Sequence, residues 1–269
     1  MKLLIATPLF SFWGDAGHFW LRAFNRLGHY AIVWDYRLEP EPPKVEVDAS
    51  IVFKGETIDP VILPRPSICY WPDAFERDPG IEEKLKKYDK VFTPVKPTPD
   101  GMIWLPTGWE PLIHRDLKLL RSIDTLYIGT ANSEYKVNMI KAIAPQVVAG
   151  NEWGKYGVRA LPPQYLHDFV HLVNQSKILI DIHQAPHIGI NRKLFESITC
   201  GFTLVDKVPG VDEIFPGFYH DISFKSPDTA RSKILYYLTH EKERDEVWEL
   251  EKQAIQPYSY ENCARQILF

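Results

Sequence analysis

The sequence predicts an α/β fold built from two successive series of parallel strands and helices. A βαβ unit opens the chain, with a strand expected over 2–7, a helix that stops at Gly28 and a strand over 31–34. A second βα series begins at 125–132. Farther along, 178–182 has the length and β-branched composition of a buried parallel strand.

The remaining elements follow from apolar runs and helical periodicity between Gly, Pro and polar breaks. Further strands are expected at 50–54, 68–73, 90–93, 102–106, 146–149 and 202–206. Further helices are expected at 80–88, 134–143 with Ser133 as its N-cap, 163–174, 229–240, 241–252 and 258–268. The segment 107–122 is interpreted as a linker between the two series.

Length and composition are those of an ordinary globular protein. The chain has 269 residues, of which 45% are hydrophobic and 25% are charged, and a net charge of −4 that offers no general attraction to nucleic acid or to an anionic membrane. No apolar run approaches the ~20 residues of a membrane span, and the first residues are interpreted as a strand rather than a signal peptide. Three separated cysteines form neither a disulfide framework nor a zinc pattern, so a cytoplasmic location is expected.

The stretch 177–217 carries the most informative local pattern in the sequence. The strand over 178–182 runs into a loop that holds His183, Gln184 and Gly189. Ligands of open α/β sheets bind at the carboxyl ends of the strands. The loop is therefore a candidate binding segment.

A short helix follows this loop, with Asn191 placed as its N-cap. Arg192 and Lys193 lie in its first turn, where the helix dipole disfavours cations unless an anion binds there. Glu196 lies one turn after Arg192 on the same face, and its carboxylate can accept hydrogen bonds from two vicinal hydroxyls of a ribose. Phosphate next to ribose indicates a nucleotide. The alternative is a solvated ion pair between Arg192 and Glu196 on an ordinary helix.

The run G-x-N-x-x-x-F-E-x-x-x-C-G, from Gly189 to Gly201, resembles the donor-site signature of GT-B glycosyltransferases. It is most similar to that of the CgeB-like group (spore maturation protein B), and the segment 208–215 is similar to that group too. Weaker similarity extends toward both ends of the chain.

This resemblance implies a GT-B fold, with two Rossmann-like domains that face a central cleft. The acceptor-side domain is expected at 1–117 and the nucleotide-sugar-binding domain at 118–257, with a C-terminal helix at 258–269 that crosses back to the first domain. The implied activity is that of a hexosyltransferase-like enzyme that moves a sugar from a nucleotide sugar to an acceptor hydroxyl. Family frequency favours a UDP-sugar such as UDP-glucose. The donor is a substrate, so no cofactor is expected.

The resemblance also implies which residues contact the donor. They are Gly129, Thr130, His183, Gln184, Gly189, Asn191, Arg192, Lys193 and Glu196. Arg192 and Lys193 are expected at the diphosphate, Glu196 at the ribose, and His183 and Gln184 near the transferred sugar. The sequence has no Asp-x-Asp motif, and GT-B enzymes generally need no metal, so metal-independent transfer is expected.

An inverting transfer requires a base near the acceptor hydroxyl, and Asp15, His18 and Asp73 are the candidates. Asp15 and His18 lie in or beside the first loop, which the family places at the mouth of the cleft. Asp73 lies near the carboxyl end of an expected strand. Asp15 as a helix cap and His18 as a surface histidine are equally good interpretations.

Three other functions stay open at this point. They are glycosyl transfer to modified DNA bases, binding of a sugar or nucleotide by a non-catalytic structural protein, and epimerase or phosphorylase activity on the same fold. The sequence does not identify the acceptor, which could be a glycan, a protein or a modified nucleic acid. It also leaves open the stereochemical outcome and whether the protein is a monomer or a homodimer.

Overall fold

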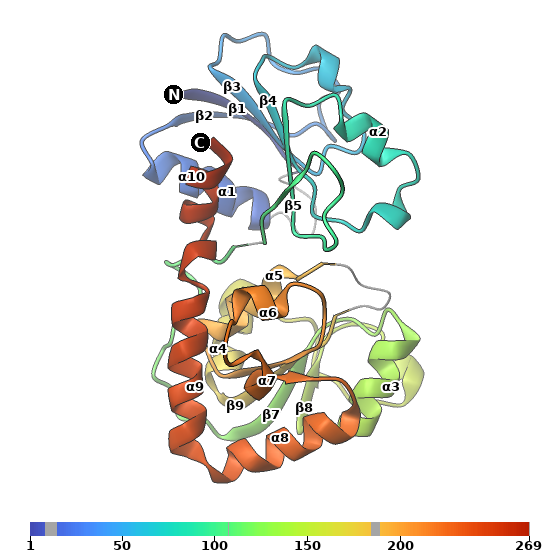
Figure 1. Ribbon diagram of the computed structural model, residues 1–269, viewed down its shortest axis with the longest axis vertical. Coiled ribbons are helices and arrows are strands. Elements are labelled where there is room, and N and C mark those ends of the chain that lie inside the picture. Colours follow the sequence, from blue (N-terminus) through green and yellow to red (C-terminus); the bar gives the residue numbers. More distant parts are fainter. Residues whose placement is uncertain (9–14, 107, 184–188, 269) are drawn as a thin grey trace. The chain divides into compact units, whose positions relative to one another are not determined.

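The computed structural model describes residues 1–8, 15–106, 108–183 and 189–268. The chain divides into two compact units. Unit 1 comprises Met1–Gly108 and Tyr258–Phe269, and unit 2 comprises Trp109–Pro257. Each unit is built around one parallel sheet (Figure 1).

The sheet of unit 1 has six parallel strands in the order β2-β1-β3-β4-β5-β6. The strands are β1 (Lys2–Ala6), β2 (Tyr30–Trp34), β3 (Ala49–Phe53), β4 (Ser67–Tyr70), β5 (Lys90–Thr93) and β6 (Ile103–Trp104). The helices of this unit are α1 (Asp15–Arg26), α2 (Ile81–Leu85) and α10 (Tyr260–Leu268). Strands β1 and β3 are almost fully buried because they have neighbours on both sides.

The C-terminal helix α10 packs against α1 within unit 1, where aromatic rings join the two helices to the sheet. The Trp20 ring of α1 stacks on Phe53 of β3, with ring centroids 4.7 Å apart, and meets Tyr260 of α10 edge-on at 5.0 Å. An ion pair of 3.3 Å between Arg26 and Glu261 extends the contact. The last helix therefore belongs to the unit that contains the first strands.

The sheet of unit 2 has five parallel strands in the order β11-β10-β9-β7-β8. The strands are β7 (Ile123–Ile128), β8 (Val147–Ala149), β9 (Ser176–Asp181), β10 (Thr203–Asp206) and β11 (Ser223–Phe224). The helices are α3 (Glu134–Ile143), α4 (Leu166–Asn174), α5 (Arg192–Ile198), α6 (Val211–Ile214), α7 (Tyr219–Ile222), α8 (Pro227–Thr239) and α9 (Glu241–Ala254). Helix α3 packs against α8, and α5 packs against α9. The predicted α/β fold with two parallel sheets is confirmed.

Several predicted elements end earlier or begin later than expected. Strand β4 stops at Tyr70, and the helix expected from residue 80 is reduced to α2, which begins after Gly80 in the left-handed conformation (φ 88°). Helix α4 begins at Leu166 rather than at residue 163, and the residues up to Tyr165 are not helical. Helices α6 and α7 and strand β11 were not predicted, since each spans at most four residues.

Most of the expected linker is folded into unit 2. The indole of Trp109 donates a 3.1 Å hydrogen bond to the carbonyl of Ile255. The Arg121 guanidinium donates to the carbonyls of Ser176 (2.7 Å) and Cys200 (2.9 Å). Residues 109–122 therefore help to form the unit that carries the glycosyltransferase-like motif.

Candidate functional site

The strand order of unit 2 reverses between β7 and β9. From β7 the chain continues outward to β8 on one side, and β9, β10 and β11 follow on the other. Connections that leave in opposite directions open a crevice at the carboxyl ends of the two central strands, and open α/β sheets bind ligands there. Gly129 follows β7 at this edge, and Asp181 ends β9. The motif recognised in the sequence, which follows β9, therefore begins at the edge of the sheet where open α/β folds bind ligands.

Asp181 and Lys193 form a buried ion pair at this edge. Asp181 is 0% exposed, and its Oδ1 lies 2.7 Å from Nζ of Lys193. The same amine donates a 2.7 Å hydrogen bond to the carbonyl of Ile128, at the end of β7, and lies 5.0 Å from the ring centroid of Tyr127. Burial raises the pKa of Asp181, but Lys193 and then His183 outweigh burial and hold the pKa below its ordinary value. Lys193 thus joins α5 to both central strands.

His183 and Asp206 form a second buried pair. Nδ1 of His183 lies 2.6 Å from Oδ1 of Asp206, and the backbone N–H of His183 donates to both carboxylate oxygens, at 3.1 and 3.0 Å. On the other side of the ring, Nε2 accepts a 3.2 Å hydrogen bond from the N–H of Asn191. Burial lowers the pKa of His183, but Asp206 and Asp181 outweigh burial and raise it above the ordinary value. The ring is therefore held from both sides.

Asn191 caps α5, as predicted. Its side chain accepts a hydrogen bond from the N–H of Leu194 at 3.2 Å. Its Nδ2 donates to Asp181 at 3.3 Å. The start of α5 is thus fixed by local capping and by the end of β9.

Arg192 and Glu196 lie on one face of α5, with Nε and Oε1 3.4 Å apart. Glu196 is only 7% exposed, so the pair is not the solvated one that the sequence left open. Nε2 of His114 lies 3.9 Å from the same carboxylate oxygen. His114 comes from the expected linker and gave no local signal in the sequence, because only the fold brings it to α5.

Close backbone packing surrounds Gly129. Gly150 has a φ of 133°, and a Cβ added there would lie 2.2 Å from the Gly129 carbonyl oxygen. A Cβ on Gly129 would lie 2.5 Å from Oη of Tyr127. The indole of Trp153 donates a 2.7 Å hydrogen bond to the Gly129 carbonyl. The loop through Gly129 and Thr130 is therefore held close to the sheet.

The acceptor-side candidates lie in unit 1. Asp15 begins α1, and His18 is exposed on the same helix. Asp73 follows β4 and forms a 2.9 Å ion pair with Lys54, which follows β3 and has a positive φ of 73°. Lysine rarely adopts this backbone conformation, and such strain clusters at functional sites. Gln184, expected near the transferred sugar, lies outside the described residues.

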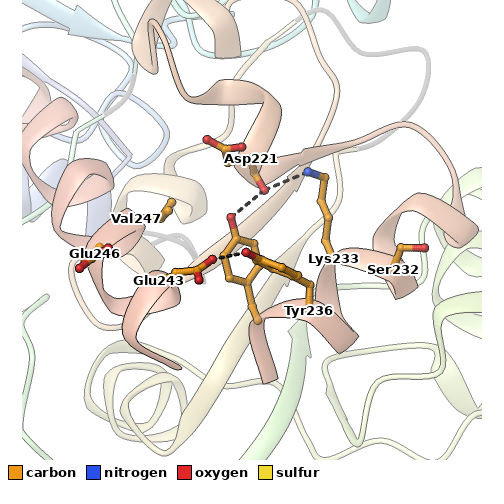
Figure 2. A pocket seen from close by; sticks show the side chains of 8 residues that line it. Asp221, Ser232, Lys233, Tyr236, Glu243, Glu246 and Val247 are labelled. Atoms are coloured by element: carbon orange, nitrogen blue, oxygen red, sulfur yellow. Dashed lines mark hydrogen bonds between the residues drawn. The ribbon is translucent and has the colours of Figure 1, made fainter. Parts of the chain in front are cut away.

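Two cavities lie away from the motif. One, of about 470 Å³, is lined mainly by α8 and α9 and also by Asp221, which precedes β11 and so lies toward the amino ends of the strands (Figure 2). Several of its polar groups pair with one another: Lys233 donates to the Asp221 carbonyl and Tyr236 donates to Glu243 (Figure 2). Tyr237 also donates to the Asp221 carbonyl. The other, of about 480 Å³, lies in unit 1 beside the loops that follow β2 and β3.

Among the residues that the structure describes, no group of three or more His, Cys, Asp or Glu side chains could hold a metal ion. No helix within the described ranges is long and apolar enough to cross a bilayer.

A family model described as glycosyl transferase-like matches residues 134–268, which is half of the chain. The chain belongs to this family. The match runs from α3 to α10 and includes Asp181, His183, Arg192 and Glu196. The protein is therefore a glycosyltransferase. A comparison with curated protein sequences finds no match.

Solved structures of glycosyltransferases share the fold over nearly the whole chain. HepE (Alr3699) from Anabaena, in complex with UDP and glucose, has a TM-score of 0.70 at 12% identity, covering 100% of this chain and 98% of that one. The DNA-modifying enzyme β-glucosyltransferase has a TM-score of 0.69 at 10% identity, covering 98% and 97%. T4 phage BGT in complex with UDP and Mn²⁺ has a TM-score of 0.65 at 9% identity, covering 99% and 98%. At these low identities the structural similarity shows that this protein has the GT-B fold.

Proposed function

We propose that this glycosyltransferase uses a UDP-sugar, with UDP-glucose the first donor to test, and transfers the sugar to an acceptor hydroxyl. The donor would bind at the carboxyl ends of β7 and β9. The observation that carries this proposal is the buried Glu196 carboxylate beside Arg192 on α5, at the edge where the strand order reverses. The UDP complexes of HepE and T4 phage BGT support the choice of nucleotide.

Glu196 is proposed to accept hydrogen bonds from the ribose hydroxyls. Its carboxylate is shielded from water, so hydrogen bonds to it are stronger than they would be at the surface. The neighbouring Arg192 is partly exposed and would bind the diphosphate, where charge develops as the sugar leaves. Lys193 would add positive charge to the same edge while it remains paired with Asp181.

We also propose metal-independent transfer, since fixed cations can supply the charge stabilisation that a metal ion gives in other transferases. Gly129 and Thr130 would lie beneath the donor phosphates. Asp73, with Asp15 and His18 as the other candidates, would act as the base for an inverting reaction. The CgeB-like assignment and the cytoplasmic location belong to this proposal as well, the latter supported by three buried free cysteines.

The decisive experiment measures nucleotide binding and transfer together. Thermal-shift assays with UDP, GDP, ADP and dTDP at one common concentration should show the largest stabilisation with UDP. When that concentration is 100 times the dissociation constant of UDP, the stabilisation by UDP is about 2.7 kcal/mol. Transfer from UDP-glucose should then be followed in EDTA with sugar acceptors, peptides and DNA that carries hydroxymethylated bases. Transfer only to such DNA would establish the DNA-modifying alternative. Absence of both UDP binding and turnover would refute the proposal.

Variants test the two assignments separately. Glu196→Gln should weaken UDP binding by about 1–3 kcal/mol. It should also reduce the preference for UDP over 2′-deoxy-UDP, because the amide offers the ribose hydroxyls one acceptor oxygen in place of two and carries no charge. Arg192→Met should weaken binding of UDP but not of uridine. Glu249→Gln, on the exposed side of α9, serves as the matched control and should change neither.

A further inference from the structure

A buried polar network joins the ends of β9 and β10 to the start of α5. We propose that Asp206 and His183 are positioning residues of the donor site, which hold Arg192 and Glu196 in place through the backbone of Asn191. This inference rests on the proposed function, because it assigns a role to groups that support the donor-binding face of α5.

The first link runs from β10 to His183. Asp206 is the last residue of β10 and is 2% exposed. Its carboxylate accepts hydrogen bonds from the backbone N–H and from the ring of His183. With Nδ1 protonated, the ring has one orientation in which both bonds form, so Asp206 fixes the tautomer as well as the position of the imidazole.

The second link runs from His183 to α5. In the neutral imidazole, with its proton on Nδ1, the lone pair of Nε2 accepts the N–H of Asn191 at 3.2 Å, which ties the N-cap residue to the end of β9. Both ring nitrogens are therefore used within the protein, and the ring is 2% exposed. On this geometry His183 acts on the donor through Asn191 and α5 rather than by direct contact with the transferred sugar.

A purely structural role does not explain why this position is polar. Burying carboxylates is energetically unfavourable, and well-packed apolar residues often replace a buried ion pair without loss of stability. A hydrogen-bonded network instead specifies one geometry, and a displacement of about 1 Å in a site can lower catalysis by roughly 100-fold. Arg192 directly follows the residue that the network holds, and Glu196 lies one helical turn after Arg192.

The same strand provides a matched control. Glu251 of α9 is 0% exposed, and its Oε2 accepts a hydrogen bond from the N–H of Thr203 at the opposite end of β10. Asp206→Asn replaces a buried carboxyl group that belongs to β10, and Glu251→Gln replaces a buried carboxyl group of α9 that contacts β10. Only Asp206 lies at the carboxyl end of the strand.

Two substitutions of His183 separate its two bonds. The amide of Asn occupies the position of Nδ1, so His183→Asn can still donate to Asp206 but offers Asn191 no acceptor. The amide oxygen of Gln occupies the position of Nε2, so His183→Gln retains the acceptor for Asn191. Both variants lose the same ring, and the difference between them reports the link to α5.

The experiment measures the dissociation constant of UDP and the kcat and KM for UDP-glucose, together with Tm, in the intact protein. His183→Asn and Asp206→Asn should raise the dissociation constant and lower kcat/KM by about 10- to 100-fold. His183→Gln should recover most of this loss, and Glu251→Gln should match the wild type in donor affinity, kcat and KM. Hydrogen exchange at the Asn191 and Leu194 amides, measured without donor, should be faster in His183→Asn than in His183→Gln.

Several results would overturn the inference. Equal donor affinity and turnover in His183→Asn, His183→Gln and the wild type would show that the network does not act on the donor site. Equal losses in His183→Asn and His183→Gln, with Tm lowered alike, would mean that the residue only stabilises the fold. A wild type that neither binds UDP nor transfers sugar would instead refute the proposed function, and the exchange rates would still test the link to α5.

Discussion

Glu251 allows a quantitative prediction because it is a carboxyl group in an apolar setting. It is 0% exposed, and its Oε2 accepts one hydrogen bond, from the N–H of Thr203. Its Oε1 has no hydrogen-bond partner among the described residues. Burial raises its pKa well above the ordinary value of 4.5, and the Thr203 hydrogen bond only partly opposes this. The folded protein therefore keeps Glu251 protonated where the unfolded chain has already released the proton.

The sign and size of the effect follow from proton linkage. Above pH 4.5 the folded state binds one more proton at Glu251 than the unfolded state does, so stability decreases as the pH rises toward the raised pKa of the folded protein. One proton corresponds to about 1.4 kcal/mol for each pH unit between the ordinary pKa and the raised pKa of the folded protein. Glu251→Gln cannot ionise and should lack this decrease.

The assay is urea unfolding of the wild type and Glu251→Gln at pH 5, 6, 7 and 8. The free energy of unfolding of the variant relative to the wild type should rise with pH, by up to about 1.4 kcal/mol per pH unit, until the raised pKa of Glu251 is reached. A constant offset between the two proteins does not affect this slope; it arises because the neutral acid leaves one buried O–H donor unpaired and the amide leaves two N–H donors unpaired. Glu249→Gln, whose carboxylate is exposed on the same helix, should show no such slope.

A pH-independent difference between Glu251→Gln and the wild type would contradict the reasoning. It would mean that Glu251 is ionised in the folded protein at neutral pH, so that the interior around α9 and β10 solvates a carboxylate better than its burial indicates.

Three further changes should have predictable effects on stability, measured by urea unfolding. Gly150→Ala should destabilise by more than about 2 kcal/mol, since its Cβ would lie 2.2 Å from the Gly129 carbonyl oxygen and its φ is positive; a neutral result would show that this loop yields easily. Ser226→Ala removes the capping box of α8 and should cost about 1 kcal/mol without changing UDP binding. Trp248→Phe should cost about 1–3 kcal/mol, because the carbonyl of Ile198 loses a buried donor.

The elements that the sequence predicted best are those fixed by local chemistry. Ser133 and Asn191 both cap their helices through the expected side-chain hydrogen bond to a backbone N–H three residues later. Buried parallel strands such as β5 and β9 were recognised by their continuous apolar runs, 91–92 and 178–180, which strands with neighbours on both sides favour. Elements of two to four residues carry too little pattern to be recognised, as β11 shows.

Contacts between distant segments could not be predicted in this way. Gly201, the last residue of the motif, lacks the left-handed φ of a C-cap glycine. A Cβ there would lie 2.9 Å from Nη1 of Arg121. The side chain of Arg121, from the expected linker, passes over this glycine to reach the carbonyl of Cys200. The space above the glycine is thus occupied by a residue 80 positions earlier in the chain.

The site shows the same division between local and distant information. The spacing of Arg192 and Glu196 indicated a shared helix face, but spacing alone could not distinguish a solvated pair from a buried carboxylate. The difference comes from His114 and from the packing of α5 on its sheet. Asp206 gave no signal of its own, because an acid that ends a strand is common. It gains a role only because parallel strands bring the ends of β9 and β10 together, where the carboxylate meets a histidine that holds the next helix. In folds of this kind, polar residues that end adjacent strands should therefore be considered together when a site is sought from sequence.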